Sequence, residues 1–85
     1  MRTLRQNRID RALARVLGSI GDYLLPDATL RTEVALHVVP PPTTAEMDEA
    51  IRHADTQRRI IGIQGETGPK WKLSEVGQAW HAENP

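Results

Sequence analysis

The chain has 85 residues, of which 39% are hydrophobic, 4% are aromatic and none is cysteine, and its eleven basic residues balance its eleven acidic residues. This length suits one domain over residues 1–85, because such a chain buries only about 60–65% of the surface that its unfolded form exposes and cannot maintain two cores. The zero net charge gives no long-range attraction to nucleic acid or an anionic membrane, and the lack of cysteine excludes disulfides and thiolate chemistry. No apolar stretch approaches the roughly 18 residues of a membrane span. We therefore expect a cytoplasmic protein without membrane attachment.

Apolar residues at helical spacing predict a first helix that ends near residue 20. Ile9, Ala12, Leu13, Val16, Leu17 and Ile20 recur at intervals of three and four. Either Asn7 or Thr3 is a suitable N-cap, and Gly18 and Gly21 mark the end of the helix. Three arginines fall on the side away from the apolar stripe and give this helix a basic outer face: Arg8, Arg11 and Arg15.

The sequence "DYLLP" and the segment after it predict a very short strand and then a second helix. The run Tyr23 to Leu25 is apolar and too short for a helix. Pro26 suits a helix start, and a stripe of Leu30, Val34, His37 and Val38 continues the helical pattern. Three prolines at 40–42 then require the helix to stop near Val39, since proline donates no backbone hydrogen bond and disfavours helix at the residue before it.

A third helix is predicted over residues 44–57. Thr43 stands three residues ahead of Glu46, which is the spacing of a capping box in which each residue satisfies a free amide of the other. The residues that form its apolar stripe are Met47, Ala50, Ile51 and Ala54. The rigid proline corner therefore ends one helix, precedes the next and restricts the angle between them.

After residue 59 the periodicity changes from helical to alternating. Runs over 60–64 and 70–73 surround "GETGP" and predict a β-hairpin with a glycine-bearing loop at 65–69. Trp71 and Leu73 share one face of the second run, and Lys70 and Lys72 share the other face, which indicates a sheet with one solvated side. Ser74 is a suitable N-cap for a short final helix patterned by Val76, Ala79 and Trp80.

This order of elements, together with the segment "WKLSEVGQAW", resembles the winged-helix (winged helix-turn-helix) family over residues 8–82. In that family the second hairpin strand commonly ends in leucine, followed by serine or threonine, two further residues and a glycine. Leu73, Ser74 and Gly77 match this pattern. The resemblance implies an α+β, mostly helical fold: a three-helix bundle with a short strand, a C-terminal β-hairpin wing and a short final helix.

The resemblance also implies a function, in which the third helix enters a DNA major groove and the hairpin contacts the backbone or minor groove. The helical wheel of the third helix turns Ala45, Glu49, Arg52 and Thr56 outward, flanked by Asp48 and His53. Arg52 is placed to reach guanine and Thr56 a base or a phosphate. The basic residues that would supplement them are Arg58, Arg59, Lys70 and Lys72, with the three arginines of the first helix.

Charge in the third helix opposes this function. Glu46, Asp48, Glu49 and Asp55 would face a polyanion, whereas phosphate attraction is the usual main source of affinity for DNA. The exposed arginines and lysines also have a plain alternative, because such residues commonly serve only to solvate the surface. We therefore carry two hypotheses: a small bacterial or phage-type regulator that binds double-stranded DNA as a homodimer, and a non-catalytic protein-protein interaction module on the same scaffold.

Metal binding, cofactor binding and catalysis are not expected. No pair among His37, His53 and His81 has the i, i+3 or i, i+4 spacing of ligands on one helical face, and His37 is predicted to be partly buried. The acidic residues lie on a convex helix in a domain too small for a water-excluded cleft, and "GETG" lacks the lysine and length of a phosphate-binding loop. Trp71 and Trp80 are predicted to close the core between the hairpin and the final helix.

Overall fold

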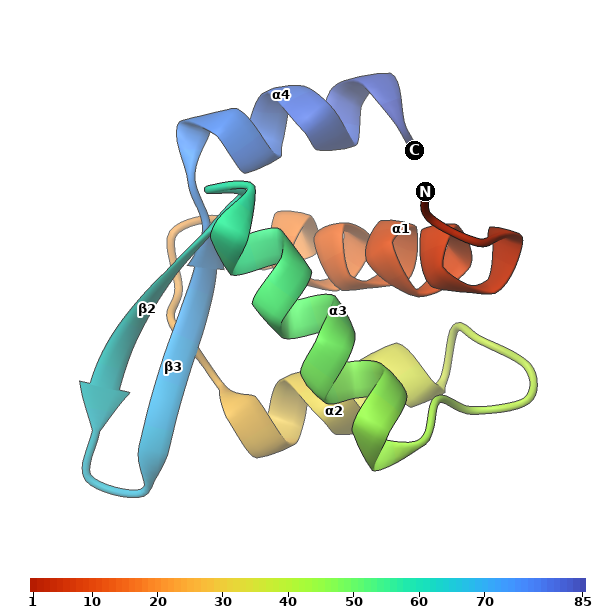
Figure 1. Ribbon diagram of the computed structural model, residues 1–85. Coiled ribbons are helices and arrows are strands. Elements are labelled where there is room, and N and C mark those ends of the chain that lie inside the picture. Colours follow the sequence, from red (N-terminus) through yellow and green to blue (C-terminus); the bar gives the residue numbers. More distant parts are fainter.

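Four helices and a three-stranded antiparallel sheet make up the fold in a computed structural model that describes residues 1–85 (Figure 1). The elements in chain order are α1 (Leu4–Ser19), β1 (Leu25–Pro26), α2 (Asp27–Ala35), α3 (Thr44–Thr56), β2 (Ile60–Gly65), β3 (Gly68–Leu73) and α4 (Glu75–Glu83). The predicted α+β, mostly helical class is confirmed, and the layout is winged-helix-like with a C-terminal hairpin. No helix combines the length and the apolar character needed to cross a membrane.

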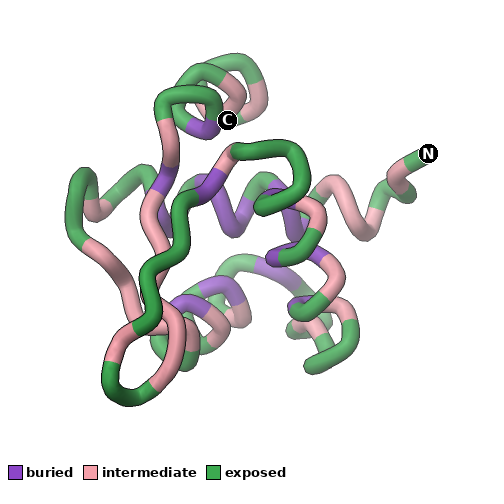
Figure 2. Tube along the Cα trace, turned by 60° about the vertical axis from the view of Figure 1, so that its left-hand side comes forward, coloured by how far each residue is buried: buried purple, intermediate pink, exposed green.

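The core lies where α1, α2 and α3 meet the base of the hairpin. Ile9, Leu13 and Leu17 of α1 are almost fully buried, and they share the core with Leu30 and Val34 of α2. The predicted stripe of α3 is buried in full, and Ile60 and Leu73 bring the paired ends of the hairpin strands into the same cluster. Figure 2 shows that most of the buried segments lie on these inward faces, whereas β2 is exposed over most of its length.

Threonine caps define the starts of α1 and α3. Thr3, one of the two predicted candidates, caps α1 through a box with Gln6, in which the Gln6 amide donates to Thr3 Oγ1 at 3.0 Å and the Thr3 amide donates to Gln6 Oε1 at 2.8 Å. The predicted box of Thr43 and Glu46 starts α3 in the same way, with distances of 3.1 and 3.0 Å. Each box satisfies two amides that a bare helix end would leave unpaired.

The predicted end of the second helix is wrong. α2 stops at Ala35, and the Leu36 amide closes its last turn onto the carbonyls of Glu33 and Val34. Val38 is nevertheless buried, because the turn after the helix brings it back to the core. It lies four residues after Val34, which is why it also fits a helical pattern. His37 has left the helical stripe and is exposed, which corrects the prediction that it is partly buried.

The first strand and the final helix also differ in detail from the sequence predictions. β1 is Leu25–Pro26, and Tyr23, expected in that strand, is 80% exposed. α4 follows its predicted cap Ser74, but Val76 and Ala79 are exposed and the buried residue of the helix is Gly77. The absence of a side chain at Gly77 lets the first turn of α4 approach the backbone of Arg59.

The hairpin is tighter than predicted. Only Glu66 and Thr67 separate β2 from β3, so the strands extend into the predicted loop at 65–69. Proline is tolerated inside β3 because Pro69 faces Gln64 in a non-hydrogen-bonded pair of the antiparallel ladder. At such a position no backbone amide is needed to donate to β2. Gly68, at φ 123°, takes the turn conformation that glycine favours. β3 is central in the sheet and β2 is an edge strand.

Candidate nucleic-acid interface

The outward face of α3 carries two of the six residues predicted to contact DNA, Arg52 and Thr56. Because Met47, Ala50, Ile51 and Ala54 are buried, the helix turns its other side to solvent, and Ala45, Arg52 and Thr56 are exposed there as predicted. Glu49, which the helical wheel placed on this outward face, is half-buried and bends toward α1. The exposed side of α3 is therefore less acidic than its sequence indicates.

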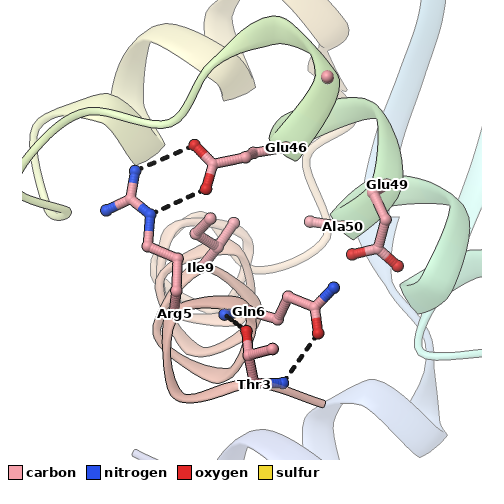
Figure 3. Close-up of a pocket in the computed structure, with 8 residues that line it drawn as sticks. Thr3, Arg5, Gln6, Ile9, Glu46, Glu49 and Ala50 are labelled. Carbon is pink, nitrogen blue, oxygen red and sulfur yellow. Dashed lines mark hydrogen bonds and ion pairs between the residues drawn. The ribbon is translucent and has the colours of Figure 1, made fainter. Parts of the chain in front are cut away.

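Three of the four α3 carboxylates are held by arginines from other elements. Arg5 of α1 makes a two-bond contact with Glu46, with Nε to Oε2 at 2.9 Å and Nη2 to Oε1 at 3.1 Å (Figure 3). Glu49 accepts from Nη1 of Arg2 at 2.6 Å. Asp48 lies 2.7 Å from Nη1 of Arg31 of α2. The contact with Glu46 is the one of the three that uses both oxygens of a carboxylate, which the planar fork of arginine suits.

These contacts keep the carboxylates ionised within the molecule. The hydrogen bonds from Arg5, helped by the amide of Thr43, lower the pKa of Glu46 from 4.5 to about 2. The hydrogen bond from Arg2 likewise lowers the pKa of Glu49 below its usual range. Each of these negative charges therefore has a positive charge beside it, and Asp55 is the α3 carboxylate without an arginine partner.

Arg2 also anchors the start of α1 to a buried acid. Its Nη2 and Nε donate to the two oxygens of Asp10 at 2.7 and 3.0 Å, and the Asp10 side chain is only 4% exposed. The same guanidinium reaches Glu49, so one arginine joins the N-terminal segment, α1 and α3. The charged contacts between α1 and α3 thus orient α3 relative to the bundle and also neutralise its carboxylates.

The turn that follows α3 separates two neighbouring arginines. Arg58 has a φ of 60°, is exposed and has no ion-pair partner. Arg59 is half-buried, with its guanidinium 4.1 Å from the centroid of the Trp80 ring, and burial lowers the pKa of Arg59 from its usual value. Its cation therefore packs on α4, whereas that of Arg58 faces solvent.

The hairpin presents basic and apolar residues together on its outer face. Lys70 and Lys72 alternate with the core-facing residues of β3, as predicted, and neither lysine takes part in an ion pair. Their direct partners across the ladder are Ile63 and Ile61, which are 50% and 41% exposed. Long lysine stems pack along such apolar neighbours while the ammonium groups stay in water.

A chain of polar contacts fixes the hairpin relative to α3. Nε1 of Trp71 in β3 donates to Oδ1 of Asp27 at 3.0 Å, and Oδ2 of Asp27 accepts from Nε of Arg31 at 2.8 Å. Arg31 in turn pairs with Asp48 of α3. The first turn of α2 therefore bridges wing and candidate recognition helix, which both leave the turn at residues 57–59 and diverge from it (Figure 1).

The hollow between α1 and α3 is lined by polar groups that already have partners. Its polar lining consists of the cap of α1, the Arg5–Glu46 contact and Glu49, and these groups already pair with one another or with Arg2 (Figure 3). No group of three His, Cys, Asp or Glu side chains is close enough to hold a metal ion. The hollow is therefore a seam stabilised by charge pairs.

Sequence reasoning missed the residues that position this interface. Arg2, Arg5 and Asp10 act over contacts that join distant segments, and no local pattern marks such contacts. The Asp27–Arg31 pair was detectable, because acid and base four residues apart lie on one face of a helix.

The predicted DNA-contacting residues lie in three places: Arg52 and Thr56 on α3, Arg58 and Arg59 in the turn after it, and Lys70 and Lys72 on the outer face of the wing. Those of α3 and Arg58 are exposed, whereas Arg59 and the two lysines are half-buried. Arg59 alone among them is committed to an aromatic contact inside the protein. Comparison of the chain with protein-family models, curated proteins and solved structures found no match.

Proposed function

We propose that this chain is a small, non-catalytic winged-helix DNA-binding protein of the bacterial or phage regulator type, working in the cytoplasm. α3 enters the major groove, with Arg52 and Thr56 directed at bases or phosphates, and Lys70 and Lys72 of the wing contact the DNA backbone. Arg58 adds a phosphate contact at the end of α3. Arg59, the remaining predicted contact, has its guanidinium over the Trp80 ring.

The internal pairing of the α3 carboxylates is the observation that carries this proposal. Three arginines are engaged with five acidic residues, namely Asp10, Asp27, Glu46, Asp48 and Glu49. Eight of the eleven basic residues therefore have no ion-pair partner, against six of the eleven acidic residues. Although the net charge is zero, unpaired cations outnumber unpaired anions. Unpaired cations bind phosphates and release the counterions that surround a nucleic-acid backbone.

A homodimer follows from the size of the module, since one domain of this kind reads few base pairs. The free edge of β2 is the surface we assign to it. Pro69 cannot donate, so its pair with Gln64 is a non-hydrogen-bonded one, and alternation leaves the amides of Gly62 and Gln64 directed away from β3. Two copies paired antiparallel along this edge would form a symmetric, self-complementary contact.

Salt-dependent binding to a random-sequence duplex, followed by mobility shift and fluorescence anisotropy, tests the function. Arg52→Ala and Lys70→Ala should each weaken binding, and Lys70→Ala should reduce the slope of log affinity against log salt by about one. Gln78→Glu is the control, because it makes the same charge change on exposed α4 and should retain binding. Absence of a shift at low salt and high protein concentration would refute DNA binding.

The interaction-module hypothesis is favoured by one observation, the exposure of Ile61 and Ile63 on an edge strand. An exposed apolar edge is a site for adding a strand from another chain. Sedimentation of the wild type and of Ile63→Lys over a concentration series tests a second copy as that chain. Self-association that Ile63→Lys abolishes supports it, and a wild type that stays monomeric throughout contradicts both this pairing and the proposed homodimer edge.

A further inference from the structure

The outer face of α1 carries three arginines that the DNA interface does not use. Arg8, Arg11 and Arg15 are exposed, and none has an ion-pair partner. Their spacing of three and four residues places them in one row, with Cα atoms about 4.5 and 6 Å apart along the helix axis. Arg2 and Arg5, at the start of the same helix, are by contrast fully engaged with acids.

This arginine row borders a groove between α1 and α2. One hollow of about 390 Å³ lies between the row and residues 37–39, and a second of about 520 Å³ lies between the end of α1 and α2. Arg15 and His37 line both hollows, so the two lie next to each other. Each has the size of a ligand pocket, and together they suit an elongated occupant better than a single ion.

The lining of this groove combines cations with apolar surface. Val38 and Val39 line the first hollow, where Val39 is 86% exposed, and Ile20 and Leu25 line the second. Glu33 is the single acidic side chain in the lining of the two hollows, and Pro85 also lines the first hollow. The groove therefore has several unpaired positive charges beside one exposed valine and two half-buried apolar side chains, with one acidic side chain to balance them.

This combination discriminates among occupants. A phosphate backbone would satisfy the arginines but would leave the valine and isoleucine surface in water. A small anion would engage one or two guanidinium groups and none of the apolar wall. An amphipathic peptide with an acidic face and an apolar face satisfies both, because carboxylates at helical spacing meet the arginine row while aliphatic side chains cover the wall.

We propose that the groove between α1 and α2 binds an acidic amphipathic segment of a partner protein. Arg8, Arg11 and Arg15 recognise its carboxylates, and the exposed Val39, with the half-buried Ile20 and Leu25, contacts its apolar residues. The surface consists of residues other than those assigned to DNA on α3 and the wing, so the proposal does not rest on DNA binding. If both functions hold, one small domain carries a DNA-reading surface and a separate docking surface for a second protein.

The test uses the whole chain and a fluorescent synthetic peptide of about 15 residues, long enough to form a helix when bound, with glutamate at i, i+3 and i+7 beside a leucine stripe. Two further peptides, a shuffled version of the same composition and a polyglutamate of the same length, separate pattern from charge. Fluorescence anisotropy is measured at about 0.05 and about 0.3 M salt, between which the screening length falls about 2.4-fold.

The patterned peptide should bind the wild type more tightly than either comparison peptide. Arg8→Gln/Arg11→Gln should weaken that binding about tenfold, through loss of two partly exposed ion pairs and their shared geometry. Gln57→Glu/Gln78→Glu changes the net charge by the same amount on exposed positions outside the groove and should alter affinity by less than about twofold. Val39→Ser provides an independent test of the apolar wall and should also reduce affinity.

Several results would overturn the proposal. Equal binding of polyglutamate and patterned peptide would show simple charge attraction, and equal losses in the two charge-matched variants would show that the arginine row has no special role. Competition by random duplex, together with loss of duplex binding in Arg8→Gln/Arg11→Gln, would reassign the row to nucleic acid. Circular dichroism of each variant checks folding, and Arg11→Gln alone provides a milder version of the same comparison.

Discussion

Replacing Gly77 with alanine should strongly destabilise the fold, although alanine favours a helix. A Cβ at this position would lie 1.9 Å from the carbonyl oxygen of Arg59 and 2.8 Å from its carbonyl carbon. An ordinary carbon-oxygen contact is about 3.3 Å, so the first turn of α4 would have to move by more than an ångström. The carbonyl itself is fixed, because it accepts from the Ser74 amide at 3.0 Å.

The expected cost follows from these contacts. Forcing an extra carbon into a filled site costs about 1–3 kcal/mol, and each hydrogen bond lost at the Ser74 cap adds about 1 kcal/mol. The better helix propensity of alanine returns about 1 kcal/mol. We expect a net loss of about 2–4 kcal/mol, a large share of the roughly 4–13 kcal/mol available to a chain of 85 residues.

Urea unfolding followed by tryptophan fluorescence measures this loss, and thermal melting should show a fall of at least about 10 °C. Gly18→Ala is the matched control, because its Cβ would meet the movable side chain of His81 at 3.0 Å instead of backbone. That variant should be neutral or more stable by up to about 1 kcal/mol. A Gly77→Ala protein with an unchanged or raised unfolding midpoint would refute the reasoning.

The charge pairs and the hairpin give two further expected results. Because Arg5 lowers the pKa of Glu46 from 4.5 to about 2, the ion pair should stabilise the fold above pH 4.5 and lose that contribution as the pH falls toward 2. The urea unfolding midpoint of Glu46→Gln should therefore depend less on pH in this interval than the midpoint of the wild type. Gly62→Ala should cost about 1–3 kcal/mol in thermal unfolding and alter the near-ultraviolet circular dichroism. The reason is that its Cβ would lie 2.4 Å from the ring of Trp71, which is held in place by its hydrogen bond to Asp27. An unchanged spectrum and midpoint would contradict that packing.

The elements with local signals could be predicted from the sequence. A capping box needs only four residues, so Thr43 and Glu46 located the start of α3 correctly. Alternation likewise located both hairpin strands and assigned Lys70 and Lys72 to the outer face. The end of α2 was predicted wrongly because Val38 has the spacing of a helical core residue although it is not in the helix. Val38 is buried by a turn after α2, and its burial alone explains the apolar pattern.

The positioning residues could not be predicted, for a physical reason. Arg5 and Glu46 are 41 residues apart and Arg2 and Glu49 are 47 apart, so their contacts exist only after α1 and α3 have packed. The same holds for Gly77, whose necessity is set by a carbonyl 18 residues earlier in the chain. The leucine-serine-glycine pattern that resembles the winged-helix family thus has a structural explanation here: leucine fills the core, serine caps α4, and glycine lets α4 approach the end of α3.

Charge in this molecule is organised by pairing, and the pairing explains how an acidic helix can be proposed to read DNA. Isolated carboxylates on α3 would repel phosphate, but Glu46 and Glu49 are turned toward α1, where each has a guanidinium beside it. Removing one of those arginines would therefore have two effects, a loss of the contact that orients α3 and the release of a negative charge near the groove-facing side. Arg5→Ala should for this reason weaken duplex binding without touching DNA, whereas restoring neutrality in Arg5→Ala/Glu46→Gln should recover part of it; equal binding by the two variants would show that the internal pairs serve the fold alone.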